Sequence, residues 1–305
     1  DTETTGLAGG SGTAAFLIGI GFVDGDEFCV RQYFMRDYDE EPAMLWAVAQ
    51  DLADCRQLVT FNGKMFDCPL LETRFRLGRR RFPLSAARHL DLLHPARRLW
   101  KARLDSCRLV MLEGALLRVI RVGDIPGAEI PQAYFDFVRN RDARRVARIL
   151  EHNRQDIVSL AALTALACQW VEDESLAEDP RDVYSIARVL ERAELHERSE
   201  AAYRRVLDEV SDEHAALRRA ALLRLAARRK RVGEHAEAAR LWREALVAGE
   251  LDALRELAMY LEHRQRDWDG ALQLVEEGLA RIANSGEPNE RVSAEFTWYR
   301  RNTKD

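Results

Sequence analysis

The sequence AAFLIGIGFVDGDEFCVRQYFM, residues 14–35, decides the fold of the first half of the chain. Residues 14–23 are mainly apolar with β-branched side chains, residues 24–26 read Asp-Gly-Asp, and residues 27–35 alternate between polar and apolar side chains. This pattern predicts two antiparallel strands that are joined by a tight turn. Such a hairpin is expected to feed a sheet that helices cover.

The segments that follow alternate between helix and strand. Residues 41–53 carry apolar side chains at helical spacing, residues 57–61 form a short strand, and a helix is expected over residues 67–77. Strands and helices in this order predict an α/β layer fold with a mixed sheet flanked by helices. Strand signals cease beyond residue 106, and helices are expected over the rest of this domain, at 107–117, 131–138 and 142–171.

The second half of the chain repeats one helix face. After an acidic stretch at residues 172–180, a candidate linker, similar side chains recur in three sets: Ser199, Tyr203, Val206, Leu207; Ala238, Trp242, Ala245, Leu246; and Ala271, Val275, Gly278, Leu279. The last positions of the sets are 246 − 207 = 39 and 279 − 246 = 33 residues apart, which brackets the roughly 34-residue period of tetratricopeptide repeats. A plain amphipathic helical bundle is the alternative. We therefore expect two domains, residues 1–172 and an all-α, tetratricopeptide-like domain over residues 181–305 with a binding or supporting role.

Composition narrows the class of protein. A chain of 305 residues is long enough for two cores, and 47% apolar with 32% charged residues is an ordinary globular balance. The net charge of −5 argues against a generally basic surface that coats nucleic acid, so any such contact must be local. No apolar run approaches the roughly 20 residues of a membrane helix, so no membrane partner is expected. The five scattered cysteines favour reduced thiols and a cytoplasmic protein.

Acidic residues that suit a hard cation occur in three separate segments. Asp1 and Glu3 are two apart, so their carboxylates project to the same face of an extended strand, although acids near a terminus are often merely solvated. Asp67 lies where a turn enters a helix, a position that also suits a helix cap. His152 and Asp156 are four apart on one helical face, as a simple surface pair also is.

Together, these segments resemble the three exonuclease motifs of the DEDD superfamily. The wider pattern over residues 1–170 resembles its YprB-like ribonuclease-H-like group, which typically carries a stretch like DIPGAEIPQAY, residues 124–134, before its last motif. The resemblance implies a ribonuclease-H-like fold and a metal-dependent 3′–5′ exonuclease that hydrolyses phosphodiester bonds of DNA or RNA. Position by position, it implies four metal ligands, which are Asp1, Glu3, Asp67 and Asp156. It also implies a general base, His152.

The resemblance also implies two divalent cations as cofactors. Paired cations lower the pKa of a bound water and stabilise charge on the phosphate and the leaving oxygen. Carboxylate ligands without a cluster of cysteine or histidine favour Mg²⁺ or Mn²⁺. Imidazole groups exchange protons near neutral pH, which suits His152 as the base. However, His152 has the spacing to the last Asp that the tyrosine type of the superfamily uses, so orienting water or contacting the scissile phosphate are alternative roles.

Residues beside the motifs are candidates for substrate contact. The run Thr4, Thr5, Gly6 and Leu7 resembles the family's seat for the terminal nucleotide. Asn62 either hydrogen-bonds the substrate or caps the turn. Asp91 resembles a secondary acid of related nucleases, but a structural role is favoured. An arginine cluster suits single-stranded nucleic acid, although a solvated helix end is the favoured interpretation; it consists of Arg74, Arg76, Arg79, Arg80 and Arg81.

Two further expectations concern the chain as a whole. In nucleases of this type the first motif ends a buried strand, so we expect the chain to lack residues that precede Asp1. The expected partners are a nucleic acid with a 3′ end and a protein bound through the helical repeats. Two alternative functions are a nucleic-acid-binding scaffold and a structure-specific endonuclease, each recruiting a partner through the repeats.

Overall fold

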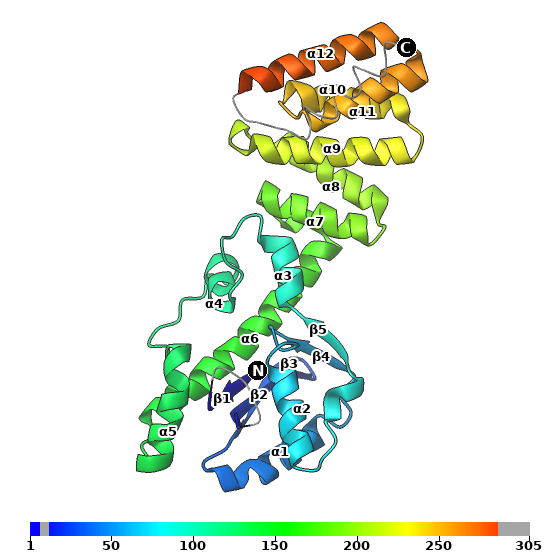
Figure 1. Ribbon diagram of the computed structural model, residues 1–305. Coiled ribbons are helices and arrows are strands. Elements are labelled where there is room, and N and C mark those ends of the chain that lie inside the picture. Colours follow the sequence, from blue (N-terminus) through cyan, green and yellow to red (C-terminus); the bar gives the residue numbers. More distant parts are fainter. Residues whose placement is uncertain (7–11, 286–305) are drawn as a thin grey trace. The chain divides into compact units, whose positions relative to one another are not determined.

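A computed structural model of the protein describes residues 1–6 and 12–285, except for the side chains of residues 212, 279 and 282–285. Leu7 and the side chain of Leu279, both named above, therefore lie outside the described residues. The chain divides into two compact units, Asp1–Glu172 and Asp173–Asp305 (Figure 1). Each unit is described by itself below.

The expected hairpin is confirmed. Strands β2 (Ala15–Asp24) and β3 (Glu27–Phe34) pair antiparallel through a turn in which Gly25 has a φ of 60°, a left-handed value that glycine adopts without strain. The short strand β1 (Thr2–Thr4) pairs antiparallel with the other edge of β2, and Glu3 lies opposite Leu17. The first acidic motif thus lies on a sheet edge.

The parallel pairing of the predicted mixed sheet occurs in a second, separate sheet. Strands β4 (Gln57–Thr60) and β5 (Arg88–Asp91) pair parallel with each other. Among the described residues no backbone ladder joins them to the three-stranded sheet β1–β2–β3. Among the described residues, the single sheet expected from the sequence is therefore divided into a three-stranded sheet and the pair β4–β5.

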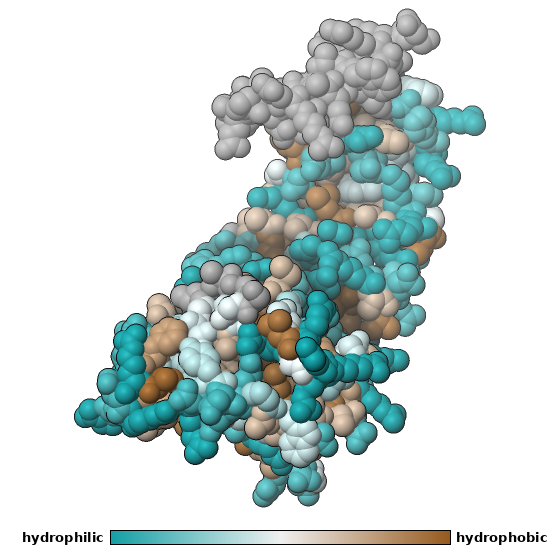
Figure 2. All heavy atoms as spheres, turned by 60° about the horizontal axis from the view of Figure 1, so that its bottom comes forward, coloured by the Kyte–Doolittle hydropathy of each residue, from teal (hydrophilic) through white to brown (hydrophobic). Residues whose placement is uncertain are grey.

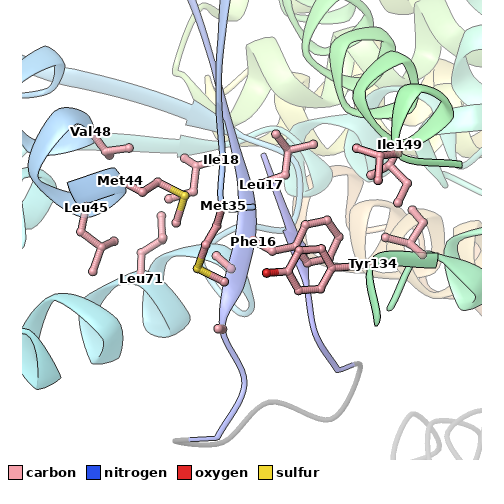
Figure 3. Close-up of a cluster of buried hydrophobic side chains, with 14 of the residues drawn as sticks. Phe16, Leu17, Ile18, Met35, Met44, Leu45, Val48, Leu71, Tyr134 and Ile149 are labelled. Carbon is pink, nitrogen blue, oxygen red and sulfur yellow. The ribbon is translucent and has the colours of Figure 1, made fainter. Parts of the chain in front are cut away.

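Helices cover both faces of the antiparallel sheet. Helices α1 (Glu41–Asp51) and α2 (Asp67–Leu77) pack on one face, and α5 (Ile130–Asn140) and α6 (Arg144–Glu172) pack on the other. Figure 3 shows the first group of buried side chains, Met44, Leu45, Val48 and Leu71, and the second, Tyr134 and Ile149, on opposite sides of the strands. The core is therefore a helix–sheet–helix sandwich that fixes the sheet edge carrying Glu3.

Two shorter helices complete this unit. Helix α3 (Leu93–Trp100) packs along α6, and its Trp100 ring meets Trp170 edge-on with centroids 6.1 Å apart. The helix expected at 107–117 is shorter than predicted, because α4 (Leu109–Leu112) passes into a π-helical turn, η3 (Glu113–Leu117). Arg118 then ends this segment in a left-handed conformation with a φ of 56°.

The second unit is helical throughout its described part. Six α-helices follow one another, and sequence neighbours pack together: α7 (Pro180–Arg192), α8 (His196–Glu209), α9 (Ala215–Arg231), α10 (His235–Val247), α11 (Asp252–Tyr260) and α12 (Trp268–Ser285). The three repeated sets of side chains lie on α8, α10 and α12. At Gly278 an added Cβ would lie 2.5 Å from Leu254 Cδ1, which explains the small residue there. Whether these pairs are tetratricopeptide repeats stays a prediction.

The acidic stretch at residues 172–180 is an ordered connection. It contains a 3₁₀ turn, η5 (Glu174–Leu176), whose Glu174 carboxylate accepts a hydrogen bond from Arg198 at 2.6 Å. Arg205 donates to the carbonyl oxygens of Glu174 and Ala177. None of the described helices is both long and apolar enough to cross a membrane. The face drawn in Figure 2 is mainly hydrophilic, with hydrophobic residues in small separate spots.

Candidate active site

Side chains from two helices that are distant in the sequence contact β1 and the residue before it. The backbone pairing of β1 with β2 continues to Asp1, whose carbonyl oxygen accepts from Gly19 N at 2.9 Å. Asp1 Oδ2 accepts a hydrogen bond from Asn153 Nδ2 of α6 at 2.7 Å, and Thr2 Oγ1 donates to Asp67 Oδ1 of α2 at 2.6 Å. All three sequence motifs therefore meet at this one short strand.

A close approach of α6 to β2 fixes Asn153. A Cβ atom added at Gly19 would lie 2.2 Å from Asn153 Oδ1, so only glycine allows this contact. Asn153 is fully buried, and its Oδ1 also accepts from Gln32 Nε2 at 2.9 Å. The amide of Asn153 is therefore oriented from both sides, which presents its Nδ2 to the Asp1 carboxylate.

The imidazole of His152 lies between three carboxylates. Its Nδ1 is 2.8 Å from Asp124 Oδ1, and its Nε2 lies 3.8 Å from Asp156 Oδ2 and 4.0 Å from Glu3 Oε1. Two groups lie near Nδ1: Asp124, which can only accept when ionised, at 2.8 Å, and Arg121 Nη1, which can only donate, at 3.4 Å. The shorter contact favours a proton on Nδ1 of a neutral ring, and Nε2 then faces Glu3 and Asp156. Burial opposes ionisation of Asp124, but its hydrogen bond with His152 prevails and lowers the pKa of this carboxyl.

Arg121 provides a fixed positive charge beside Asp156. Its guanidinium makes a two-pronged ion pair with Glu113 and donates to Asp156 Oδ1 at 2.5 Å and to Asp124 Oδ2 at 3.3 Å. The Glu113 residue is 0% exposed, and the Arg121 side chain is 9% exposed. The two partners lie in the segment η3 and in the loop after it, so this segment holds the α6 end of the site in place.

Negative charge is concentrated at this end of the site. Burial, followed by the nearby charge of Asp156, raises the pKa of Glu3 from 4.5 to about 8. Burial also raises the pKa of Asp156, whereas the charges of His152 and Arg121 lower it. Burial thus disfavours the ionised form of both carboxyl groups, and a bound cation would favour it.

The donor set fits a hard divalent cation in its chemistry, although it is not assembled around one position. Among the described residues no group of three or more His, Cys, Asp or Glu side chains is close enough together to hold a metal ion. Three predicted ligands instead contact internal donors: Asp1 contacts Asn153, Asp67 contacts Thr2 and Asp156 contacts Arg121. Carboxylate oxygens are the ligands that Mg²⁺ and Mn²⁺ prefer, and holding a cation requires that some of these donors be exchanged for it.

A cleft of about 540 Å³ opens on Asp1 and Asp156. Phe61 and Asn62, which follow β4, line it, and Asn62 has a left-handed φ of 65°. Asp91 shapes this turn, since its carboxylate is 2% exposed and accepts from the backbone N of Asn62 at 2.7 Å. The structural role expected for Asp91 is therefore confirmed, and the side chain of Asn62 is left to face the cleft.

The predicted substrate residues Thr4 and Thr5 have hydrogen-bond partners near β1. Thr4 Oγ1 donates to the carbonyl oxygen of Gly6 at 2.8 Å, and Thr5 Oγ1 accepts from Ala14 N at 3.0 Å. These bonds shape the backbone that follows β1. Their contact with a nucleotide stays a prediction.

The arginine cluster lies in the last turn of α2 and directly after this helix. Arg74 donates to Glu41 at 2.6 Å, and Arg76 pairs with Glu72 at 2.8 Å. Residues 79–81 follow the end of α2, which begins at Asp67 and has 11 residues, a length of about 16 Å. The interpretation as a solvated helix end therefore agrees with the position of the cluster.

Comparison with known proteins identifies the family. A family model described as the RNase_H superfamily matches residues 1–168. The chain belongs to the RNase_H superfamily. A protein of Bacillus subtilis (strain 168) named "Uncharacterized protein YprB" is 33% identical over 290 residues, which cover 93% of this chain and 69% of that protein. No solved structure matches the chain. Membership of the RNase_H superfamily indicates a hydrolase of nucleic acids, and such nucleases generally use divalent metal ions.

Four residues of this candidate site were not assigned a role from the sequence: Glu113, Arg121, Asp124 and Asn153. Asp124 begins the quoted stretch at residues 124–134, and Asn153 is the neighbour of His152, so motif proximity was an available signal for both. Glu113 and Arg121 carried no such signal, because their partners are brought to them only by the tertiary fold.

Proposed function

We propose that this RNase_H superfamily protein is a 3′–5′ exonuclease of the DEDD type that hydrolyses DNA or RNA by a two-metal-ion mechanism. One observation carries the proposal: at β1 and the residue before it, Thr2 contacts Asp67 of α2 and Asp1 contacts Asn153 of α6, and His152 lies near both Glu3 and Asp156. Four acids from three distant segments thus lie around one strand. The polarity of digestion comes from the resemblance to the DEDD motifs.

The proposed metal ligands are Asp1, Glu3, Asp67 and Asp156. Two bound Mg²⁺ or Mn²⁺ ions would supply water activation and stabilisation of charge on the phosphate. In this assignment the protein orients the ligands: Asn153 holds Asp1, and Arg121 holds Asp156.

His152 is the proposed general base. Its Nδ1 is held by Asp124, so Nε2 is the atom that accepts the proton from the attacking water. The resulting imidazolium is stabilised by the Asp124 carboxylate at 2.8 Å. The 3′-terminal nucleotide is proposed to contact residues 4–7 and Asn62, which lines the cleft beside Asp1.

The helical unit is proposed to consist of tetratricopeptide-like repeats that bind a protein partner. The supporting observation is the position of the repeated side chains on the second helix of each pair, α8, α10 and α12. The second unit would then recruit or position the nuclease without taking part in its chemistry.

Digestion of 5′-labelled single-stranded DNA and RNA tests the nuclease proposal. We expect a ladder of products shortened from the 3′ end with Mg²⁺ or Mn²⁺, and none with EDTA. The double variant Asp67→Asn, Asp156→Asn should be inactive, whereas Asp54→Asn, a change at an exposed acid, should digest like the parent. Equal rates for the double variant and the parent would show the assignment to be wrong. Internal products without a ladder would favour an endonuclease.

A further inference from the structure

The cleft beside the acids continues along α3. Its lining includes Leu93 and Arg97 of α3 and Lys101, the residue that follows this helix. From position 93 to position 101 the helix and its end advance by about 12 Å. Because Trp100 packs against Trp170, α3 runs along α6 away from Asp156. The cleft is therefore a channel with the acids at one end.

Positive charge lines the end of the channel that is remote from the acids. Arg97, Lys101 and the nearby Arg108 all line it and are exposed, and Asp105 is the acid among its neighbours there. In the part of the chain that the structure describes, neither Arg97 nor Arg108 pairs with a carboxylate, and the Lys101 ammonium donates to the backbone oxygen of Asp105. We call the surface formed by Arg97, Lys101 and Arg108 the cationic wall. Its three cations against one acid make it positive, although the whole chain has a net charge of −5.

Apolar side chains form other parts of the same channel. Phe61, Leu93 and Leu109 line it together with the buried Cys107. Protein surfaces that bind single-stranded nucleic acids combine cations with aromatic and aliphatic side chains. The phosphates contact the cations, and the bases lie on the apolar groups. The volume of about 540 Å³ suits one strand better than a duplex.

We propose that Arg97, Lys101 and Arg108 bind the phosphates of the single strand whose 3′ end lies at the acids. The strand then extends in its 5′ direction along α3. This proposal rests on the proposed exonuclease function for the polarity of the strand, whereas the cationic wall itself is a nucleic-acid site. The arginines at positions 79–81 offer the same charge at the far end of α2, so they form a competing path that the experiment compares directly.

Binding without hydrolysis tests the proposal. Fluorescence anisotropy would follow a 5′-fluorescein oligothymidylate in EDTA, over a series of salt concentrations, with the full chain. The wall variant is Arg97→Gln, Lys101→Gln, Arg108→Gln, and the matched control, Arg79→Gln, Arg80→Gln, Arg81→Gln, removes the same charge. We expect the wall variant to bind about tenfold or more weakly, with a salt slope smaller by about 2 because each lost phosphate contact contributes about 0.7. The control should stay within about twofold of the parent.

Three smaller variants test whether the triple substitution has only a general effect. Arg97→Gln should weaken binding, whereas Arg98→Gln, at the next position of α3 and outside the channel lining, should not. Arg97→Lys with Arg108→Lys should keep the salt slope of the parent, because the charges remain. Thermal unfolding of each variant confirms folding.

The outcomes separate the two proposals. The wall proposal is overturned when the wall variant binds like the parent, or when the control loses as much affinity as the wall variant. Digestion of the same oligonucleotide by the parent with Mn²⁺ is measured separately. If the parent does not digest it while the wall variant has lost binding, the exonuclease function fails and the cationic wall remains a nucleic-acid site.

Discussion

The two ends of the candidate site differ in how firmly they are built. At the α6 end, His152 and Asp156 are joined to Asp124 and to the buried Arg121–Glu113 pair in one continuous network. At the α2 end, Asp67 has one hydrogen bond to the strand, from Thr2, and it follows an exposed turn in which Met65 is 70% and Phe66 62% exposed.

This difference indicates which part must adjust when a cation binds. Breaking the α6 network costs buried ion pairs, whereas releasing Asp67 costs one partly exposed hydrogen bond. We therefore expect Asp67 and its turn to move toward Glu3 and Asp156, and the α6 end to stay in place. The predictions below test this contrast from the largest expected effect to the smallest.

Removing the proposed base should have a large effect on hydrolysis. His152→Ala should lower kcat by about 10²- to 10⁴-fold, because a positioned general base contributes this much. His94→Ala removes an exposed imidazole from α3 and serves as the matched control. A rate for His152→Ala within a few-fold of the parent would assign the histidine to a supporting role.

Removing Arg121 should have the largest effect on stability. Arg121→Gln leaves Glu113 buried without its cation, which typically costs about 3–5 kcal/mol of unfolding free energy. Arg141→Gln breaks an exposed pair with Asp37 and should cost about 1 kcal/mol or less. Denaturant unfolding measures both. The double variant Glu113→Gln, Arg121→Gln should recover much of the loss, and equal losses for Arg121→Gln and Arg141→Gln would contradict a rigid α6 end.

The raised pKa of Glu3 predicts a pH-dependent stability. The pKa of Glu3 is about 8 in the folded chain and near 4.5 when the side chain is solvated, so the folded state holds more protons between these values. Unfolding free energy of the metal-free protein should therefore fall as pH rises through this window, by up to about 1.4 kcal/mol per pH unit. Glu3→Gln should remove the part of this dependence that Glu3 contributes, whereas Glu27→Gln, at the exposed end of the hairpin, should leave it unchanged.

The same group couples protons to cation binding. At pH 7 a cation bound by Glu3 must displace its proton, so calorimetric titration with Mn²⁺ in buffers of different ionisation enthalpy should report release of close to one proton per chain. The heat should not depend on the buffer for Glu3→Gln. Buffer-independent heat for the parent would mean that Glu3 is already ionised or does not bind the cation.

The sequence predicted local features well because they depend on local patterns. The turn signal at residues 24–26 and the alternation after it define the hairpin, and the helical spacing of apolar residues defines α1 and most of α6. The π-helical turn at Glu113–Leu117 was missed, since its apolar spacing is that of an α-helix.

Long-range side-chain pairs could not be predicted in the same way. Arg121 and Asp156 are 35 positions apart, and Asn153 and Asp1 are 152 apart. Periodicity places each residue on a helix face or in a loop, but the partner is selected by how α6 packs on β2. That packing is possible because Gly19 has no side chain. Strand propensity registers a glycine only as an unfavourable residue and does not indicate this close contact.

The smallest effect is expected at the α2 end of the site. Thr2→Val keeps the shape of the side chain and removes the hydrogen bond to Asp67, so unfolding free energy should fall by about 0.5–1.5 kcal/mol at most. Because this bond occupies one of the Asp67 carboxylate oxygens, its loss should leave Mn²⁺ affinity equal or higher. Thr73→Val, which removes a hydroxyl bonded to the carbonyl oxygen of Pro69 within α2, is the control and should leave Mn²⁺ affinity unchanged. Weaker Mn²⁺ binding by Thr2→Val alone would mean that Thr2 holds Asp67 in its ligand position, and the contrast between an adjustable α2 end and a fixed α6 end would then be wrong.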